Sequence, residues 1–381
     1  MQKSVPIPRL EKDPPGTLPF MTQDLRGCGG RLKVVPEDFR VEEIPLYPLC
    51  GSGEHLYIQL EKESRSTEEV AEHIARTLGI PRGRIGYAGK KDAQSVSCQW
   101  FSVQTDRDPD LSALNEPGIR LISAGRHTNK LRRGHLWGNR FRIVIRGIED
   151  PSDYEEILEH IASQGFPNFF GGQRLGLQMS NAISGRALVH REAPYRGPSE
   201  RLRFQVNAYQ SFLFNRVTAL RLSTPLSTPA GWGRILEGDL AVLHRNGASF
   251  HADREELETL QVRAVQGEIS PSAPLFGYRV PLAEGLPGQW ERKILAEEGL
   301  SLESFRLGGK RSSPKGERRP VREFAHELRW ERWNDGEAPC LTLNFELRRG
   351  VYATSLAREI MKNEGLCSFS ALRSMPRATH H

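Results

Sequence analysis

The sequence predicts an α+β fold, because strand patterns near both ends of the chain are separated by a long region of different character. Short runs in which apolar and polar residues alternate lie between residues 31 and 146, and another lies at 341–347. Alternation with a period of two is typical of half-buried strands. The region 165–322 has helical patterns and a hairpin signal of its own, so we expect it to be an inserted α/β domain.

The first part of the chain should form strands and one well-defined helix. Residues 1–27 are proline-rich and aperiodic, which is typical of an extended arm. Alternating runs then predict strands at 31–35, 39–44 and 55–60. Ser66 and Glu69 have the spacing of a capping box, so a helix should begin there and end at Gly79.

After this helix comes a turn that carries the strongest candidate for catalysis. Asp92 follows Lys90 and Lys91 in a glycine-rich turn, directly before an alternating run that predicts a strand. Nearby cations favour the ionised form of a carboxyl group, which suits a nucleophile better than a general acid. The alternative interpretation is a solvated turn in which Asp92 caps the next element.

Further strand and helix signals follow. Residues 138–146 alternate with arginines on one face and Phe141 on the other, as in an antiparallel strand with a solvated back; taken alone, Phe141 is more typical of a core than of an active site. A helical stretch at 154–161 leads to 168–176, where three glycines accompany two aromatic residues and suggest a hinge or a junction.

The inserted region should contain helices, a hairpin and a loop. Residues 202–222 are expected to form an amphipathic helix and 255–265 another. Asn246-Gly247, between apolar runs, is the strongest short hairpin signal. The Pro/Gly-rich stretch 270–288 is expected to be a loop. After the insertion, the strand 341–347 leads into a helix that carries Leu356, Ala357, Ile360 and Met361 on one side.

Composition limits the classes of protein that fit. The 381 residues are 38% hydrophobic and 26% charged, as in a globular chain, and no stretch has the roughly 20 apolar residues of a membrane span. The N-terminus lacks the apolar core of a signal peptide, so we expect a cytoplasmic protein without a membrane partner. Five irregularly spaced cysteines with no CxxC pair, and the lack of a P-loop or dinucleotide fingerprint, predict no metal, cofactor or disulfide framework.

The net charge of +6 is modest, but the basic residues are clustered. Blocks with aromatic residues close by are typical of proteins that bind single-stranded or looped RNA, although each block alone could be a solvated face. The blocks are Arg82–Lys91, Arg126–His135, Lys310–Arg322 and Arg348–Arg349.

Five separated motifs, in order along residues 30–362, resemble the TruD family of tRNA pseudouridine synthases. The turn Ala88–Asp92, followed by a run that ends in QWFSV, resembles the family's AGxKD segment. The other four are Asp38–Val41, Gly138–Phe141, Asn168–Gly176 and Gly350–Thr354. The resemblance implies a catalytic domain with a bent, mostly antiparallel mixed sheet flanked by helices, formed by 1–164 and 323–381 and interrupted by an inserted α/β domain at 165–322.

The resemblance also implies roles for individual residues. Asp92 corresponds to the catalytic aspartate, and Phe39, Asn139 and Tyr352 fall where the family contacts the target nucleotide. Phe141 falls where other pseudouridine synthases carry an active-site tyrosine. Two further candidates, for contacting phosphate or orienting Asp92, are Lys91 and Arg174. The implied substrate is tRNA at uridine 13 of the D-arm, and no obligatory protein partner is inferred.

Two other classes of protein compete with this interpretation, besides a synthase that acts on another structured RNA. A glycosidase would need a second carboxylate across the scissile bond, and the residues beside Asp92 are lysines instead. A non-catalytic RNA-binding protein would keep the basic blocks but would have no need of Asp92.

Overall fold

The computed structural model describes residues 18–91, 95–195, 199–225, 231–308 and 313–363. By their contacts these residues form two compact units, each assembled from separate stretches of the chain. The sheet unit comprises Gly29–Pro151 and Ala325–Val351, and the helical unit comprises the described residues of 1–28, 152–324 and 352–381. The catalytic and inserted domains predicted from the sequence have other boundaries, and these boundaries stay a prediction.

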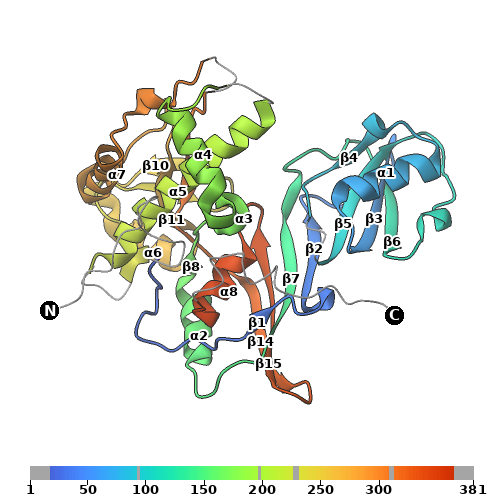
Figure 1. The fold of residues 1–381 in the computed structure, drawn as a ribbon, viewed down its shortest axis with the longest axis horizontal. Helices are drawn as coiled ribbons and strands as arrows, with labels where there is room; N and C mark the ends of the chain where they lie inside the picture. Colours follow the sequence, from blue (N-terminus) through green and yellow to red (C-terminus); the bar gives the residue numbers. More distant parts are fainter. Residues whose placement is uncertain (1–17, 92–94, 196–198, 226–230, 309–312, 364–381) are drawn as a thin grey trace. The chain divides into compact units, whose positions relative to one another are not determined.

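The sheet unit is built on a nine-stranded mixed sheet with the strand order β14-β15-β7-β2-β5-β3-β6 (Figure 1). Outside this order, β1 pairs with β7, and β4 pairs with β5. Only β2 and β5 run parallel among the described strand pairs of this sheet, which confirms the expected mostly antiparallel arrangement. The strands are β1 (Arg31–Leu32), β2 (Phe39–Pro45), β3 (His55–Glu63), β4 (Ile85–Tyr87), β5 (Val96–Gln104), β6 (Ile119–His127), β7 (Leu136–Arg146), β14 (His326–Asn334) and β15 (Pro339–Arg348).

Helix α1 (Thr67–Leu78) covers one part of this sheet and has the predicted ends. The hydroxyl of Ser66 accepts a hydrogen bond from Glu69 N, and the Glu69 carboxylate accepts one from Ser66 N. Gly79 ends the helix in the left-handed conformation, at φ 62°. The apolar stripe of α1 then packs on Ile58 of β3 and Phe101 of β5, both fully buried.

The predicted strand around Phe141 is confirmed as β7, which lies between β2 and β15. Phe141 faces the core, whereas Arg140 and Arg142 are exposed on the other face. The guanidinium of Arg140 pairs with Glu42 of β2 at 3.0 Å and with Glu346 of β15 at 2.8 Å. Charge on this solvated face is thus balanced across three neighbouring strands.

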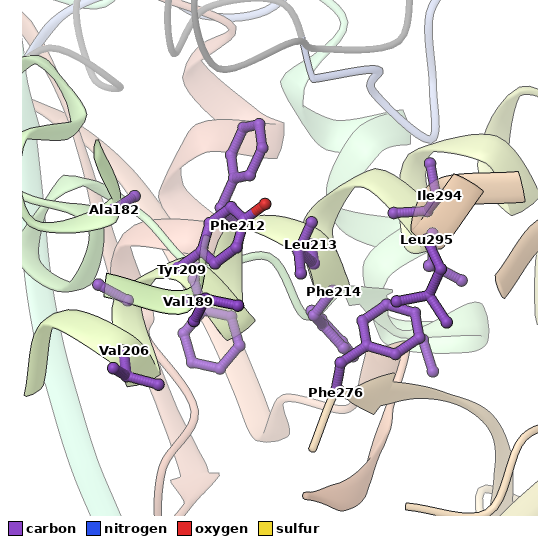
Figure 2. Packing of buried hydrophobic residues seen from close by; sticks show 14 of the residues in the cluster. Ala182, Val189, Val206, Tyr209, Phe212, Leu213, Phe214, Phe276, Ile294 and Leu295 are labelled. Atoms are coloured by element: carbon purple, nitrogen blue, oxygen red, sulfur yellow. The ribbon is translucent and has the colours of Figure 1, made fainter. Parts of the chain in front are cut away.

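The helical unit is organised around α5 (Ser199–Ser223), where the structure corrects one expectation. The sequence predicts an amphipathic helix, but every residue from Ala208 to Arg221 is buried. Figure 2 shows α5 side chains, among them Tyr209 and Phe214, with Phe276 and Ile294 from other segments. The polar side of α5 can be buried because its charges form ion pairs with other segments of the unit. Arg216 pairs with Glu297 and Glu298, and Arg221 pairs with Asp239 at 2.8 Å.

A four-stranded sheet, β10-β9-β11-β12, packs with the helices of this unit, and a short pair, β8 and β13, accompanies it. The hairpin predicted at Asn246-Gly247 is confirmed by the antiparallel pairing of β9 with β10. The remaining elements are α2 (Tyr154–Gln164), β8 (Phe166–Pro167), α3 (Gly172–Leu175), α4 (Ser180–Val189), β9 (Leu240–Leu243), β10 (Ser249–His251), α6 (Leu257–Val265), β11 (Ile269–Leu275), α7 (Gly285–Glu297), β12 (Glu317–Pro320), β13 (Arg322–Glu323) and α8 (Ala353–Met361).

The expectation of a loop at 270–288 holds only for its middle part, residues 276–284. The two ends of the stretch are wrong, because they hold most of β11 and the first turn of α7. Residues Ile269–Pro274 are all buried, so exposed and buried residues do not alternate along this strand. Its two prolines are residues that usually indicate a loop.

The expected N-terminal arm is also corrected, for residues 18–28. The Arg358 guanidinium of α8 donates to the carbonyls of Leu18 and Pro19, and the Glu359 carboxylate accepts from Met21 N at 3.0 Å. The Arg358 guanidinium also lies 3.9 Å from the ring centroid of Phe20. These contacts are long-range in sequence, which is why a local pattern cannot predict them.

None of the helices in the described parts of the chain is long and apolar enough to cross a membrane.

We predict that Gly185→Ala destabilises the helical unit, although alanine is the better helix former by roughly 1 kcal/mol. A Cβ at Gly185 of α4 would lie 2.0 Å from the carbonyl oxygen of Gln205 in α5, so the two helices must separate. Overpacking of this kind costs about 1–3 kcal/mol. The midpoint of denaturant unfolding measures the change.

The matched control is Ser184→Ala on the same helix, where the partly exposed side chain donates a hydrogen bond to Ser180 O. Its effect should stay within about 0.5 kcal/mol. A Gly185→Ala protein as stable as the wild type would show that α4 and α5 do not pack this closely.

Candidate active site

One face of the sheet unit gathers four of the residues predicted from the sequence, Phe39, Asn139, Phe141 and Lys91, beside a buried carboxylate that was not predicted. On this face β2 contributes Phe39 and Glu43, and β7 contributes Asn139 and Phe141. The antiparallel register places Glu43 directly opposite Asn139. Because opposite residues of paired strands have their side chains on the same face, a buried carboxylate lies beside an amide. Lys91 reaches the same point from the turn after β4.

The aromatic residues on this face pack against one another. Phe39 and Phe141 meet edge to face with ring centroids 6.1 Å apart, and Phe141 stacks on Phe345 of β15 at 5.4 Å. All three rings are buried, while the ammonium group of Lys33 lies 4.4 Å from the centroid of Phe39. Phe141 therefore has the core contacts that its strand position suggests.

The ammonium group of Lys91 joins the carboxylate to the amide. Its Nζ lies 3.2 Å from Glu43 Oε1 and donates a hydrogen bond to Asn139 Oδ1. The side chain of Glu43 is 0% exposed and that of Lys91 is 11% exposed. An ion pair with so little access to water requires good geometry, since desolvation opposes the attraction of the charges.

Further hydrogen bonds complete the surroundings of the Glu43 carboxylate and fix the backbone before Asp92. Glu43 accepts from Trp100 N at 2.9 Å and from Gln99 Nε2 at 3.3 Å. Gln99 Nε2 also donates to Gly89 O at 2.7 Å, and its Oε1 accepts from Thr67 Oγ1 at 2.9 Å. The same Thr67 hydroxyl accepts from Lys91 N at 2.8 Å. We call Glu43, Thr67, Lys91, Gln99 and Asn139 the Glu43 network.

Burial and charge act in opposite directions on Glu43. Burial raises the pKa of this carboxyl group above its usual range, because the charged form loses its water. The Lys91 ammonium and the hydrogen bonds from Trp100 and Gln99 oppose that rise. The ionised carboxylate in the protein thus depends on its cation.

The predicted nucleophile, Asp92, lies outside the described residues. The preceding residue, Lys91, is held by its backbone N–H and by its side chain in the Glu43 network. The following alternating run is β5, as expected.

The other two predicted residues lie in the helical unit, around Phe170. Tyr352 packs edge to face on Phe170 at 5.8 Å, and the Arg174 guanidinium lies 5.9 Å from the centroid of the same ring. The backbone of Phe170 is fixed from both sides, because its N–H donates to Asn215 Oδ1 and its carbonyl accepts from Asn215 Nδ2, each at 2.9 Å. Phe170, in the segment 168–176 that was expected to be a hinge or a junction, is therefore held firmly inside this unit.

The basic block at 310–322 differs from expectation in its last part. The Arg318 side chain is 2% exposed and pairs with Glu291 at 2.7 Å. Arg319 lies 4.3 Å from the Phe170 centroid and donates to Asn168 Oδ1, and Arg322 is buried and donates to Ser270 Oγ at 3.0 Å. These arginines stabilise the helical unit and do not form a solvated face. Arg132 and Arg133 of the second block are exposed, as expected.

Sequence reasoning missed Glu43, Thr67 and Gln99. A signal exists for two of them, because a charged or amide residue occurs in phase with apolar ones along a strand. Glu43 follows Phe39 and Val41 at intervals of two, and Gln99 precedes Phe101 and Val103 in the same way. A polar residue on a buried face needs a partner and so marks a network. In the described parts of the chain, no three His, Cys, Asp or Glu side chains are grouped to hold a metal ion.

Comparison with known proteins gives one consistent match. The family model described as tRNA pseudouridine synthase D (TruD) matches residues 17–195 and 197–360. A protein named tRNA pseudouridine synthase D from a strain of Thermus thermophilus is 44% identical over 356 residues, which cover 92% of this chain and 94% of the relative. A protein of the same name from a strain of Anaeromyxobacter dehalogenans is 42% identical over 91% of this chain and 97% of its own.

The fold is also similar to that of a solved structure of a protein with this name. A crystal structure of a Methanosarcina mazei protein, provisionally named tRNA pseudouridine synthase D (TruD), superposes with a TM-score of 0.75. The match covers 91% of this chain and 97% of that chain, at 27% sequence identity. The fold class expected from the resemblance, a mixed sheet with flanking helices of this family's type, is confirmed.

We predict that Lys91→Met destabilises the sheet unit, and does so more at pH 8 than at pH 5. The change leaves the Glu43 carboxyl group buried without its cation, which costs about 3–5 kcal/mol when the carboxyl is charged. Protonation relieves this cost. A carboxyl group whose pKa is raised by folding stabilises the fold fully at low pH, and that stability is lost as the pH rises through the folded-state pKa.

Denaturant unfolding at several pH values measures this dependence. Glu43→Gln added to Lys91→Met should remove the extra pH dependence, because no titrating group remains in the pair. An equal loss of stability at pH 5 and pH 8 would mean that Glu43 does not depend on Lys91 for its charge.

Proposed function

The chain belongs to the TruD family of tRNA pseudouridine synthases, and on that premise we propose that it modifies uridine 13 of the tRNA D-arm with Asp92 as its nucleophile. Members of this family are isomerases that convert uridine to pseudouridine in tRNA. The position in the tRNA and the role of Asp92 are our proposal.

The Glu43 network carries the proposal. It fixes Lys91, the residue before Asp92, against Asn139 on the same sheet face as Phe39 and Phe141. A positive charge next to Asp92 in sequence favours an ionised carboxylate. A preorganised cation, amide and aromatic pair beside a nucleophile are the parts that such an isomerisation needs.

The reaction can be balanced without oxidation or hydrolysis. The N1–C1′ bond of uridine breaks, the freed uracil turns, C5 bonds to C1′, and the C5 proton is lost while N1 gains one. The Asp92 carboxylate either bonds to C1′ as the N1–C1′ bond breaks and leaves again as C5 bonds to C1′, or stabilises an oxocarbenium-like sugar without a covalent bond. The target must first leave its stack, because neighbouring bases enclose the reacting atoms.

We propose supporting roles for the remaining candidates. Asn139 hydrogen-bonds the uracil edge, while Phe39 and Phe141 provide an apolar wall for the detached base. In the helical unit, Tyr352 contacts the target nucleotide, and Arg174 contacts phosphate. The exposed Phe204, whose ring centroid lies 5.5 Å from the Arg174 guanidinium, supports a nucleotide contact here by offering an aromatic surface next to a charge.

We predict that Asp92→Asn abolishes pseudouridine formation and leaves tRNA affinity within several-fold of wild type. A neutral amide cannot act as the nucleophile, whereas affinity rests mainly on phosphate contacts. Release of tritium from C5 of labelled uridines measures turnover, and filter binding measures affinity. The RNA mass should stay constant.

The outcomes separate the competing functions. Substantial turnover by Asp92→Asn would falsify the assignment of the nucleophile. Loss of a base from the RNA would indicate a glycosidase. No tritium release from any RNA, with tight binding, would indicate a non-catalytic RNA-binding protein. Release from a different tRNA position or another RNA would keep the chemistry and reject uridine 13. Tyr87→Phe, at a position outside the proposed machinery, serves as the control and should retain wild-type turnover.

A further inference from the structure

The partner of the Asn139 carbonyl determines which way the amide points. A lysine ammonium has three donors and no acceptor, so the amide atom that faces Lys91 Nζ must be the oxygen. The Nδ2 group therefore lies at the other end of the amide and can only donate. Among the described residues it has no hydrogen-bond partner.

The position of Lys91 depends in turn on Glu43. Nζ lies 3.2 Å from Glu43 Oε1, and Glu43 is held by Trp100 N and Gln99 Nε2. A flexible lysine side chain loses much rotational freedom when it is fixed, so a buried carboxylate is needed to keep it on the amide. Polarisation by the ammonium also strengthens the opposite N–H as a donor.

Solvent exposure distinguishes Asn139, which can contact a substrate, from Glu43, which cannot. Asn139 is partly exposed, whereas the Glu43 side chain has no exposed surface. A base on this sheet face can therefore touch Asn139 but not Glu43.

Resting on the proposed function, we propose that Glu43 is a positioning residue that acts through Lys91 and presents Asn139 Nδ2 as a donor to O4 of the target base. Uracil has a carbonyl oxygen at position 4, where cytosine has an amino group. A fixed donor thus pairs with uracil, and it faces another donor if cytosine enters. Unpaired polar groups in a closed site give strong discrimination, so the network selects uridine over cytidine.

The test compares Glu43→Gln with Glu61→Gln in the full-length protein. Glu61, on β3 of the same sheet, also forms an ion pair, with Arg120 at 2.9 Å, but lies outside the Glu43 network. Single-turnover rates and dissociation constants are measured on tRNA transcripts with uridine, 4-thiouridine or 2-thiouridine at the target site. Sulfur is a weak acceptor, so 4-thiouridine should slow the wild type roughly tenfold.

Glu43→Gln should slow turnover of uridine by about tenfold or more, keep the dissociation constant within about threefold, and lose most of the 4-thio effect. Glu61→Gln should leave all three unchanged. In an Asn139→Ala background, Glu43→Gln should have little further effect on the rate, because it acts through that amide. Additive losses, an unchanged 4-thio effect, or an effect of 2-thiouridine in its place would overturn the proposal.

A second measurement needs neither RNA nor activity. In protein with 15N-labelled asparagine, the Nδ2 signals of Asn139, assigned with Asn139→Asp, should shift in Glu43→Gln and stay in place in Glu61→Gln. If Glu43→Gln does not fold, Glu43→Gln with Lys91→Met removes both charges together, buries no unpaired charge, and should show the same shift.

Unmoved Nδ2 signals would overturn the proposal even if the enzyme modifies tRNA. Shifted signals in a protein that does not modify tRNA would instead reject the proposed function and leave the network intact.

Discussion

The buried ion pair between Glu43 and Lys91 is the interaction on which the candidate site depends. It joins β2 to the turn before Asp92 and, through Asn139, to β7. Burying two charges is unfavourable unless each is paired and hydrogen-bonded. Here Glu43 accepts hydrogen bonds from Trp100 N and Gln99, and Lys91 donates one to Asn139. Because the pair has few alternative arrangements, it fixes the geometry of a turn that glycine-rich sequence alone would leave loose.

The helical unit uses the same physical principle for another purpose. Arg216 and Arg221 lie on the central helix α5 and are buried with Glu297, Glu298 and Asp239 as partners. Because these charges are paired, a helix that carries polar residues can lie in the middle of the core. In the sheet unit a buried pair supports a candidate site, whereas in the helical unit buried pairs connect α5 to the segments around it.

Local signals in the sequence predicted local structure well. The capping box at Ser66 and the Asn246-Gly247 hairpin are confirmed because a few neighbouring residues determine each of them. β11 was not predicted, because a strand that is buried on both faces has no alternation of apolar and polar residues. Asn139, Phe141 and Lys91 could be selected by resemblance, but Glu43 becomes visible only when the strand register places it opposite Asn139. The partners of buried charges depend on tertiary contacts that no short window of sequence contains.

The order of the strands has a consequence for synthesis on the ribosome. β7 ends at Arg146, but its neighbour β15 begins at Pro339, after the whole helical segment 152–324 has been made. During that interval the nascent sheet has an open edge along β7, a ready template for pairing with another chain. The two exposed arginines of β7, Arg140 and Arg142, place charge on that strand. Charge on an open strand hinders wrong pairing until the hairpin of β14 and β15 arrives.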